Sequence, residues 1–284
     1  MKIRLGRVDY LNCLPVYYAL EKNFVVPGFP LRIVGGVPTA LNQMFFNGRL
    51  DVTPLSSIEY ARHYRKCIIL PGISISADGC VGSILLFSRL PATELEGCRV
   101  AVTSSSATSV VLLQVLFEHY YHVNTTFLVQ PPDLETMLQG ADAALLIGDE
   151  ALIARQRVQN EGLPVRVTDL GEAWKRFTGE EMVYALWAVR KEFAQQYPAE
   201  TNVLARCLLA AKKEGMARLS EVIQTARRRT GLPGPVLEEY FGLVRYDFDS
   251  GYQRALLLFY DYAYKSGLIK DRVNSLEIWG EDVV

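Results

Sequence analysis

LNQMFFNGRLDVTPLSSIEY, residues 41–60, and LETMLQGADAALLIGDEAL, residues 134–152, are two stretches with the same order of features. Each shows an amphipathic helix, a glycine, an acidic residue, a short apolar strand, a small polar loop and the start of a new helix. Gly48 and Gly140 suit the left-handed position that ends many helices. The repetition predicts two similar α/β units in one chain. The alternative is that any two strand-helix units look alike.

The two polar loops are the first candidates for a binding site. Ser56 and Ser57 follow the apolar strand of the first unit, and Gly148 and Asp149 follow the strand of the second. Open α/β sheets bind their ligands at the carboxyl ends of their strands. Two such units would therefore present matching loops to a cleft between them.

The rest of the chain extends the α/β pattern. Strand-like and helix-like segments alternate through residues 1–87, and a second cycle begins at Arg99. An apolar strand is expected at Met182–Val189. It precedes a mainly helical tail, with helices expected at Leu204–Leu219, Leu237–Leu243 and Tyr252–Tyr264.

This order of segments predicts a two-lobed α/β protein with a ligand cleft between the lobes. Residues 1–87 and 184–284 would form lobe one, which includes the helical tail, and residues 88–183 would form lobe two. The chain would cross between the lobes twice, near Phe87–Arg89 and near Val183–Trp187. The tail is expected to close over the first lobe.

Composition excludes several classes of function. A chain of 284 residues has length for one large or two modest domains, and 50% hydrophobic with 21% charged residues is ordinary for a globular protein. The formal net charge of -1 shows no excess of positive charge that would favour binding to nucleic acid or an anionic membrane. No uncharged apolar segment reaches bilayer length, and the N-terminus lacks the pattern of a signal peptide. We therefore expect a cytoplasmic protein without membrane insertion.

A third stretch, VTSSSATSVVL at residues 102–112, combines a strand end, a run of small hydroxylated residues and an apolar helix. The free N–H groups of a first helical turn, with serine and threonine hydroxyls beside them, can bind a carboxylate or phosphate. No G-x-x-x-x-G-K-[ST] or G-x-G-x-x-G motif accompanies it, so a small organic acid is favoured over a nucleotide. The candidate residues are Ser105, Ser106, Thr108 and Ser109. The alternative is an ordinary serine cap on a core helix.

Residues typical of nucleophilic or metal catalysis are not visible. H-E-x-x-H and G-x-S-x-G are absent, and His63, His119 and His122 are expected on helix faces or ends away from the candidate loops. The five cysteines are odd in number, widely spaced and without C-x-x-C, which argues against a disulfide framework and a zinc site. Neither a metal nor a cofactor is expected. The candidate loops are neutral and polar, and Asp149 is their one charged member.

Asn12 lies in GRVDYLNCLP, residues 6–15, between the first strand and a helix opened by Pro15, where asparagine is a common cap. This decapeptide and five further stretches, in the same order, closely resemble the chorismate dehydratase family. The five are PLSSIEY (54–60), LPGISISADGCVGSILLFS (70–88), VTSSSATSVVL (102–112), IGDEAL (147–152) and DLGEAWKRFTG (169–179). The helical tail matches only in general character.

The resemblance implies a fold of the periplasmic-binding-protein type II class and a lyase that needs no cofactor. Its substrate would be chorismate, dehydrated to 3-[(1-carboxyvinyl)oxy]benzoate in the first step of the futalosine route to menaquinone. A sister family, which makes 1,4-dihydroxy-6-naphthoate, shares the fold but begins with a Ser-Pro-Cys-Pro-Asn type of motif. The segment Tyr10–Pro15 therefore favours the dehydratase. A small-organic-anion binding protein of the same fold is the remaining alternative.

The resemblance also implies roles for individual residues. Asn12 would be the catalytic residue that holds the reacting groups, while the enolpyruvyl carboxylate of the substrate takes the proton. Asp149 is the fallback base, and its alternative role is to cap the helix that starts near Glu150. The expected substrate-binding residues are Tyr10, Ser56, Ser57, Ser83, Ser105, Ser106, Thr108, Ser109 and Asp149.

Overall fold

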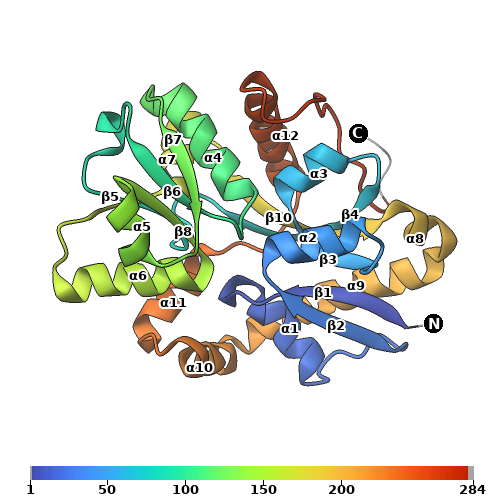
Figure 1. Cartoon of the computed structure of the whole chain (residues 1–284). Coiled ribbons are helices and arrows are strands. Elements are labelled where there is room, and N and C mark those ends of the chain that lie inside the picture. Colours follow the sequence, from blue (N-terminus) through green and yellow to red (C-terminus); the bar gives the residue numbers. More distant parts are fainter. Residues whose placement is uncertain (1, 281–284) are drawn as a thin grey trace.

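The computed structural model describes residues 2–280 as a two-lobed α/β molecule built on two five-stranded sheets (Figure 1). The strand order is β2-β1-β3-β10-β4 in the first sheet and β7-β6-β8-β5-β9 in the second. The strands are β1 (Ile3–Val8), β2 (Leu31–Gly36), β3 (Val52–Ser56), β4 (Cys67–Ala77), β5 (Ile84–Ser88), β6 (Arg99–Thr103), β7 (Thr126–Gln130), β8 (Ala143–Ile147), β9 (Arg166–Asp169) and β10 (Met182–Arg190).

Helices cover both sheets and form the tail. They are α1 (Leu14–Glu21), α2 (Pro38–Phe46), α3 (Ser57–His63), α4 (Thr108–Leu116), α5 (Leu134–Gly140), α6 (Gly148–Glu161), α7 (Leu170–Thr178), α8 (Lys191–Gln196), α9 (Pro198–Ala217), α10 (Leu219–Thr230), α11 (Gly234–Leu243) and α12 (Ser250–Lys265). Three short turns complete the list: η1 (Leu11–Cys13), η2 (Ala92–Glu94) and the π-helical η3 (Phe117–Tyr121). None of the described helices is long and apolar enough to span a membrane.

Two strands run against their neighbours and connect the lobes. β5 is antiparallel to β8 and β9 in the second sheet, and β10 is antiparallel to β3 and β4 in the first. Both sheets are therefore mixed. β5 and β8 are buried at every position, which explains their continuous apolar sequences.

Strand pairing also bears on where one lobe ends and the next begins. The boundaries expected after residues 87 and 183 fall inside β5 and β10. All of β5 pairs within the second sheet, and β10 pairs within the first from its first residue. Because pairing decides to which lobe a strand belongs, we propose that the lobes divide at the connections 78–83 and 179–181.

Helix ends match the sequence expectations only in part. Gly48, with φ +72°, directly follows α2 and its cap residue as expected. The same expectation for Gly140 is wrong, because this glycine is the last residue of α5 and the chain continues directly into extended Ala141. The expected helix at residues 204–219 begins earlier, at Pro198, and is broken at Arg218, after which α10 follows.

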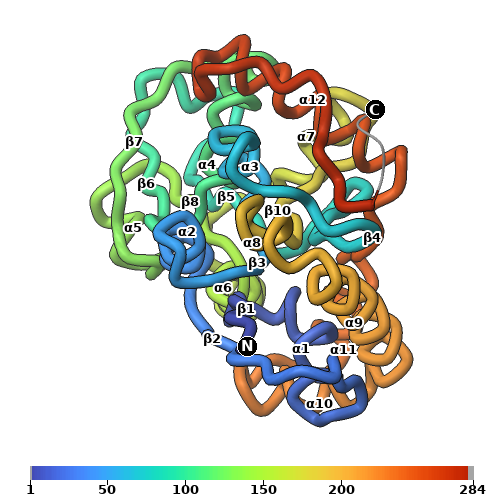
Figure 2. Tube along the Cα trace, turned by 90° about the vertical axis from the view of Figure 1, so that its right-hand side faces the viewer, coloured from blue at the N-terminus to red at the C-terminus, as the bar shows by residue number. Residues whose placement is uncertain are grey.

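The helical tail contacts both lobes, whereas the sequence predicted that it would close over the first. α9 packs on α1 so closely that a Cβ on Gly215 would lie 1.8 Å from the carbonyl oxygen of Pro15. α12 packs against α3, α4 and β10 (Figure 2). The Trp174 ring of α7 lies with its centroid 5.8 Å from those of Phe259 and Tyr262 in α12. Aromatic side chains on α12 thus pack the tail against lobe two as well.

Candidate active site

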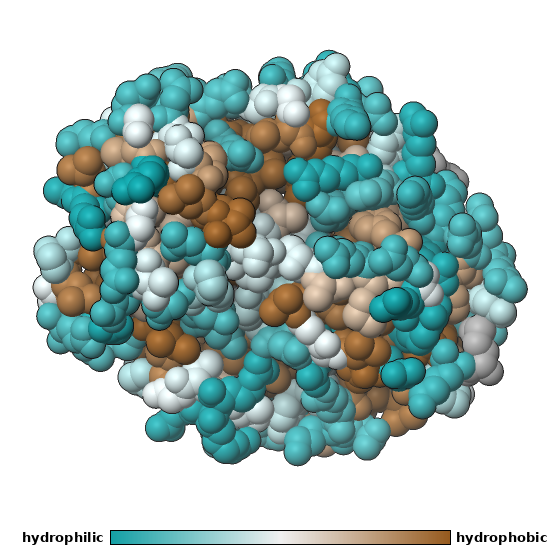
Figure 3. Space-filling model, viewed as in Figure 1, coloured by the Kyte–Doolittle hydropathy of each residue, from teal (hydrophilic) through white to brown (hydrophobic). Residues whose placement is uncertain are grey.

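A cavity lies between the lobes, at the carboxyl ends of strands from both sheets. The space free of protein atoms in and around it is about 540 Å³, which includes open solvent. In Figure 3 residues of near-neutral hydropathy gather at the centre of the face where the lobes meet. The residues that line the cavity are Val8, Tyr10, Asn12, Cys13, Pro38, Pro54, Ser56, Ile75, Ser83, Ile84, Ser106, Thr108, Ser109, Ile147, Gly148, Tyr184 and Ala185.

The cavity wall combines hydroxyl and amide groups with a larger share of apolar surface, and none of its lining residues in the described part of the chain is charged. It contains the first residues of three helices, Pro38 of α2, Thr108 of α4 and Gly148 of α6. The N-terminus of a helix has unpaired N–H groups and a partial positive charge. Helices from both lobes therefore supply the positive potential that an anionic ligand requires, without any lysine or arginine.

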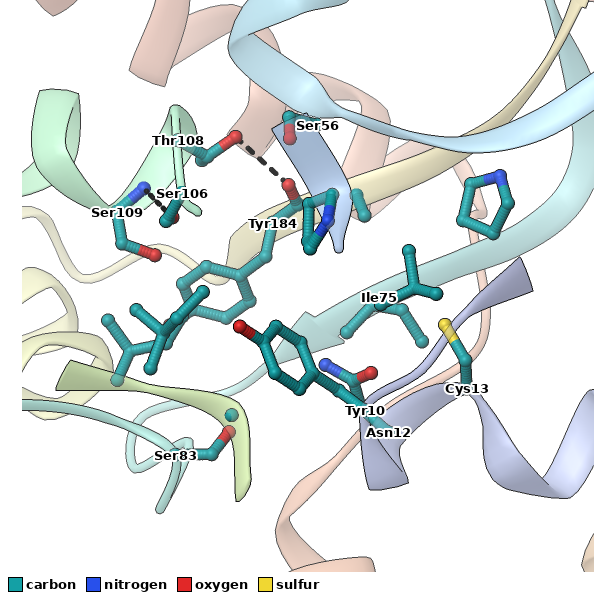
Figure 4. Close-up of a pocket in the computed structure, with 17 residues that line it drawn as sticks. Tyr10, Asn12, Cys13, Ser56, Ile75, Ser83, Ser106, Thr108, Ser109 and Tyr184 are labelled. Atoms are coloured by element: carbon teal, nitrogen blue, oxygen red, sulfur yellow. Dashed lines mark hydrogen bonds between the residues drawn. The ribbon is translucent and has the colours of Figure 1, made fainter. Parts of the chain in front are cut away.

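Asn12 belongs to η1, the turn between β1 and α1, and faces the cavity together with Tyr10 (Figure 4). Its side-chain oxygen Oδ1 is buried and has no hydrogen-bond partner in the described part of the chain. Neither η1 nor α1 receives a side-chain cap, so the interpretation of Asn12 as a helix cap is wrong. An unpartnered buried oxygen costs stability in the empty protein, and a ligand donor would satisfy it.

Tyr10 is fixed by contacts with lobe two. Its hydroxyl donates to Ser105 Oγ at 3.3 Å, and burial raises its pKa to about 12, so the phenol is neutral at physiological pH. Gly148 lies under the ring: a Cβ at this position would be 2.7 Å from two of the ring carbons. The φ of Gly148 is +61°, which a larger residue adopts only with strain.

Thr108 joins the lobes with its hydroxyl. Oγ1 accepts from the backbone N–H of Ile58 at 3.3 Å and donates to the carbonyl oxygen of Tyr184 at 3.1 Å. Ser57 lies beside it, with its Oγ 3.4 Å from Thr108 Oγ1, and donates to the carbonyl oxygen of Val183 at 2.8 Å. Ser57 is fully buried and does not line the cavity. Its contacts hold α3 against the crossover strand β10.

Two further hydroxyls of the wall, those of Ser106 and Ser56, also have partners. Ser106 Oγ accepts from the N–H of Ser109 at 3.3 Å, which makes Ser106 a cap of α4. Ser56 Oγ accepts from the side-chain amide of Asn42 at 3.0 Å. The carbonyl oxygen of Ser83, which also lines the cavity, accepts from the N–H of Gly148 at 2.7 Å.

Asp149 does not line the cavity and does not cap its own helix. Its Oδ1 accepts from the backbone N–H of Leu11, in the opposite lobe, at 2.8 Å, and its Oδ2 lies 3.6 Å from the guanidinium of Arg229. Burial raises the pKa of this carboxyl to about 6, against the lowering effects of the Leu11 hydrogen bond and the Arg229 charge. The expectation that Asp149 caps α6 is therefore wrong.

The structure thus brings together most of the residues named from sequence. Seven of the ten line the cavity, and Ser57, Ser105 and Asp149 lie directly behind its wall. Tyr184 also lines the cavity, and Asn42 supports Ser56; neither carried a sequence signal, because their positions depend on tertiary packing.

Asp169, in the DLGEAW stretch, was not named as a site residue, yet it holds the loop before Ser83. Its carboxylate accepts from the N–H groups of Val81 and Gly82, as well as from Gly171 and Glu172 of α7. Burial raises its pKa, which these four backbone hydrogen bonds oppose. The sequence signal that could have identified Asp169 is its place directly before a helix, where aspartate is a common cap.

The histidines lie outside the cavity wall, whereas one cysteine, Cys13, lines it. His63, His119 and His122 bond to Glu59 O, Ser266 Oγ and Glu118 O, and none of them lines the cavity. Within residues 2–280 no three histidine, cysteine or acidic side chains lie together as a metal site. All five cysteines are free.

Solved structures with this architecture identify the class of fold. The chain superimposes on a protein from Archaeoglobus fulgidus with a TM-score of 0.78, at 20% identity, covering 94% of this chain and 98% of that one. The periplasmic aliphatic sulphonate binding protein of Escherichia coli gives a TM-score of 0.69 at 17% identity, covering 98% and 97%. The molecule is therefore a two-lobed protein of the periplasmic-binding-protein fold, with a neutral cavity between its lobes.

Sequence comparison then gives the family. The family described as "Menaquinone biosynthesis" matches residues 3–265, and this chain belongs to it. A chorismate dehydratase of Thermus thermophilus is 32% identical over 256 residues, 86% of this chain and 89% of that protein. A 1,4-dihydroxy-6-naphthoate synthase of the same organism is 30% identical over 193 residues, 68% of each chain. A chorismate dehydratase of Campylobacter jejuni is 28% identical over 201 residues, 68% of this chain and 73% of that one.

Proposed function

We propose that this protein is a lyase that dehydrates chorismate to 3-[(1-carboxyvinyl)oxy]benzoate, the first step of the futalosine route to menaquinone. The observation that carries the proposal is the neutral cavity ringed by helix N-termini from both lobes, in a chain with 32% identity to a chorismate dehydratase. Chorismate is a dianion with one carboxylate on the ring and one on the enolpyruvyl ether. Helix N-termini on opposite walls suit two separated carboxylates.

The reaction removes the ring hydrogen beside the ether oxygen and the neighbouring hydroxyl group. The hydrogen is acidified by the conjugated ring carboxylate, so its loss leaves a carbanion delocalised onto that carboxylate. N–H groups and hydroxyls at the start of α4, from Ser106 to Ser109, would stabilise this charge as it develops. Departure of the hydroxyl group with a proton, as water, then completes an aromatic ring.

Geometry of the substrate favours two steps. The ether and hydroxyl groups of chorismate are trans, so the departing hydrogen and hydroxyl lie on the same face, which favours a stepwise elimination over a concerted one. No histidine or carboxylate of the protein lines the cavity. The enolpyruvyl carboxylate of the substrate is therefore the proposed base, and Asn12, with its unpartnered oxygen, would hold the reacting groups in place.

Two other functions compete with this one. The sister synthase activity is represented by a relative with 30% identity, but that match covers 68% of the chain against 86% for the dehydratase. The segment Tyr10–Pro15 also favours the dehydratase. A protein that only binds an organic anion would use the same helix N-termini and would leave chorismate unchanged.

Incubation of the purified protein with chorismate tests the proposal, with the products separated by chromatography. We expect 3-[(1-carboxyvinyl)oxy]benzoate in equal amounts with and without excess chelator, because the cavity offers no cluster of metal ligands. Binding of chorismate without product would indicate an anion-binding protein. Loss of activity on chelation, restored by a divalent ion, would contradict the metal-free mechanism.

The cytoplasmic location stays a prediction that cell fractionation checks.

A further inference from the structure

The turn that carries Asn12 is attached to parts of the molecule outside its own lobe. The ring of Tyr10 lies on Gly148, and its hydroxyl donates to Ser105. The N–H of Leu11, the residue directly before Asn12, donates to Asp149 Oδ1 at 2.8 Å. All three partners belong to the second lobe. The position of Asn12 relative to Ser83, Ser106 and Ser109 therefore depends on contacts between the lobes.

Arg229 completes this arrangement from the tail. Its guanidinium lies 3.6 Å from Asp149 Oδ2 and donates to the carbonyl oxygen of Asp9, on the same turn. α10 of the tail, α6 of lobe two and the turn at residues 9–13 of lobe one thus share one cluster of charged and backbone groups. Hydrogen bonds in which one partner is charged are shorter and stronger than neutral ones.

The orientation of the Asp149 carboxylate does not suit a base. One oxygen is engaged by Leu11 and the other faces Arg229, while its neighbours Ile147 and Gly148 form the cavity wall. The side chain is 16% exposed, and burial disfavours its ionised form. A buried carboxylate is weak evidence for a gain in stability, so its contacts call for another explanation.

We propose that Asp149 and Arg229 are positioning residues: they hold the turn at residues 9–13 against lobe two and so place Asn12 for the reaction. The inference rests on the proposed function. It assigns Asp149 to the geometry of the site rather than to proton transfer, and it gives the tail a part in catalysis.

Substitutions at Asp149 separate positioning from proton transfer. Asp149→Asn keeps an oxygen that can accept from the N–H of Leu11 but loses the charge that faces Arg229, so we expect kcat to fall by less than about tenfold. Asp149→Ala loses both contacts, and we expect kcat to fall by about 10- to 100-fold with a smaller change in KM, since displacement of reacting groups acts on turnover. A general base would show the opposite pattern: Asp149→Asn would be as inactive as Asp149→Ala, and that result would overturn the proposal.

Matched variants test the part of Arg229 and control for lost charges. Arg229→Gln should lower kcat about two- to fivefold in the wild-type background and by less in Asp149→Asn, where only its contact with the carbonyl oxygen of Asp9 is left to lose. Arg228→Gln, on the same helix, should have wild-type kcat because Arg228 contacts Thr225 instead. Asp133→Ala removes another aspartate from the start of a lobe-two helix, where it accepts from Thr136, and should also leave kcat unchanged. Fully additive effects of Arg229→Gln and Asp149→Asn would contradict the proposal, because they would show no coupling between the two side chains.

Amide hydrogen exchange tests the attachment without any substrate. A peptide covering residues 9–14 should exchange faster in Asp149→Ala than in the wild type, and at the wild-type rate in Asp133→Ala. Unchanged exchange in a folded Asp149→Ala protein would overturn the inference even if chorismate is turned over. Faster exchange in a protein that does not act on chorismate would refute the proposed function alone. If Asp149→Ala does not fold, Asp149→Asn combined with Arg229→Gln tests the contacts of Arg229 with the turn: the peptide should again exchange faster than in the wild type, and unchanged exchange would overturn the role given to Arg229.

Discussion

The two stretches that share one sequence pattern contact the opposite lobe through different chemistry. α3 begins at Ser57 and α6 at Gly148, each directly after a buried strand. At the first junction, neutral groups meet: the N–H of Ile58 donates to the hydroxyl of Thr108. At the second, a carboxylate takes part, because Asp149 accepts from the N–H of Leu11. Both junctions bridge the lobes, and only the second does so with a charge.

The difference shows how similar local sequences acquire separate roles. The first junction lies against the crossover strand β10, whose carbonyl groups at Val183 and Tyr184 accept from Ser57 and Thr108. The second junction lies against the turn that carries Asn12. Neutral contacts next to a crossover are insensitive to pH and salt, whereas a buried carboxylate responds to pH.

Gly148→Ala should have the largest effect, and it acts on the second junction alone. The substitution places a Cβ 2.7 Å from the Tyr10 ring at a φ of +61°. We expect the free energy of unfolding to fall by about 2 to 5 kcal/mol, from backbone strain and overpacking together. Gly162→Ala is the matched control, because Gly162 has a φ of +62° and nothing within 4 Å of an added Cβ. Urea denaturation measures the free energy of unfolding of both variants. If both lost the same amount, the contact between an added Cβ and the Tyr10 ring would not affect stability.

Asn12→Ala should be the most damaging change to turnover. Its side-chain oxygen has no partner in the described structure, so the thermal midpoint should change little, while kcat should fall about 100-fold with a smaller change in KM. Asn42→Ala is the control, because Asn42 lies behind the same wall and does not line the cavity. Asn42 bonds to Ser56, so its loss should lower the thermal midpoint. A lowered midpoint with normal kcat in Asn12→Ala would assign Asn12 a structural role.

Thr108→Val tests the neutral junction. The hydroxyl is replaced by a methyl group of similar size, which leaves the N–H of Ile58 and the carbonyl oxygen of Tyr184 without this partner. We expect the free energy of unfolding to fall by about 1 to 3 kcal/mol, by the same amount at pH 5 and pH 8, because no titrating group takes part. Thr108 also lines the cavity, where we predict a carboxylate contact, so kcat/KM should fall as well. A destabilisation that varies with pH would contradict the assignment of a neutral contact.

The smallest effect is expected from pH, and it concerns Asp149. The groups that face this carboxyl are Arg229, Glu150, Asp9 and the N–H of Leu11, and its pKa is raised to about 6. Because the contact with Arg229 needs the ionised form, kcat should decline less than tenfold as the pH falls through 6, and Asp149→Asn should remove this decline. The free energy of unfolding should change in the opposite direction. Because the pKa of Asp149 is higher in the folded protein than in the unfolded chain, this group favours the fold below about pH 4, and that contribution is lost as the pH rises through 6. If kcat of Asp149→Asn declined with pH as it does in the wild type, the decline would not come from the Asp149 carboxyl.

Much of the fold could be predicted because its signals are local. Buried strands such as β5 and β8 are continuous apolar runs, and Pro15 and Pro38 occur at helix starts, where proline is favoured. The break between α9 and α10 at Arg218 has no glycine or proline to mark it. The contacts of α12 with Trp174 escaped prediction for a related reason, since periodicity shows that a helix has an apolar face but not what that face meets.

The alternation of strands and helices in the sequence predicts which residues come at the carboxyl ends of the parallel strands, and therefore that Asn12, Ser56 and Ser106 gather at one edge. That inference needs only the alternation of strands and helices, because the carboxyl ends of the central strands open onto the same cleft. What each polar group does there depends on tertiary packing. It directs Ser57 into the core, leaves the oxygen of Asn12 without a partner and joins Asp149 to Leu11. Such choices depend on contacts between residues far apart in the chain, which no local pattern encodes.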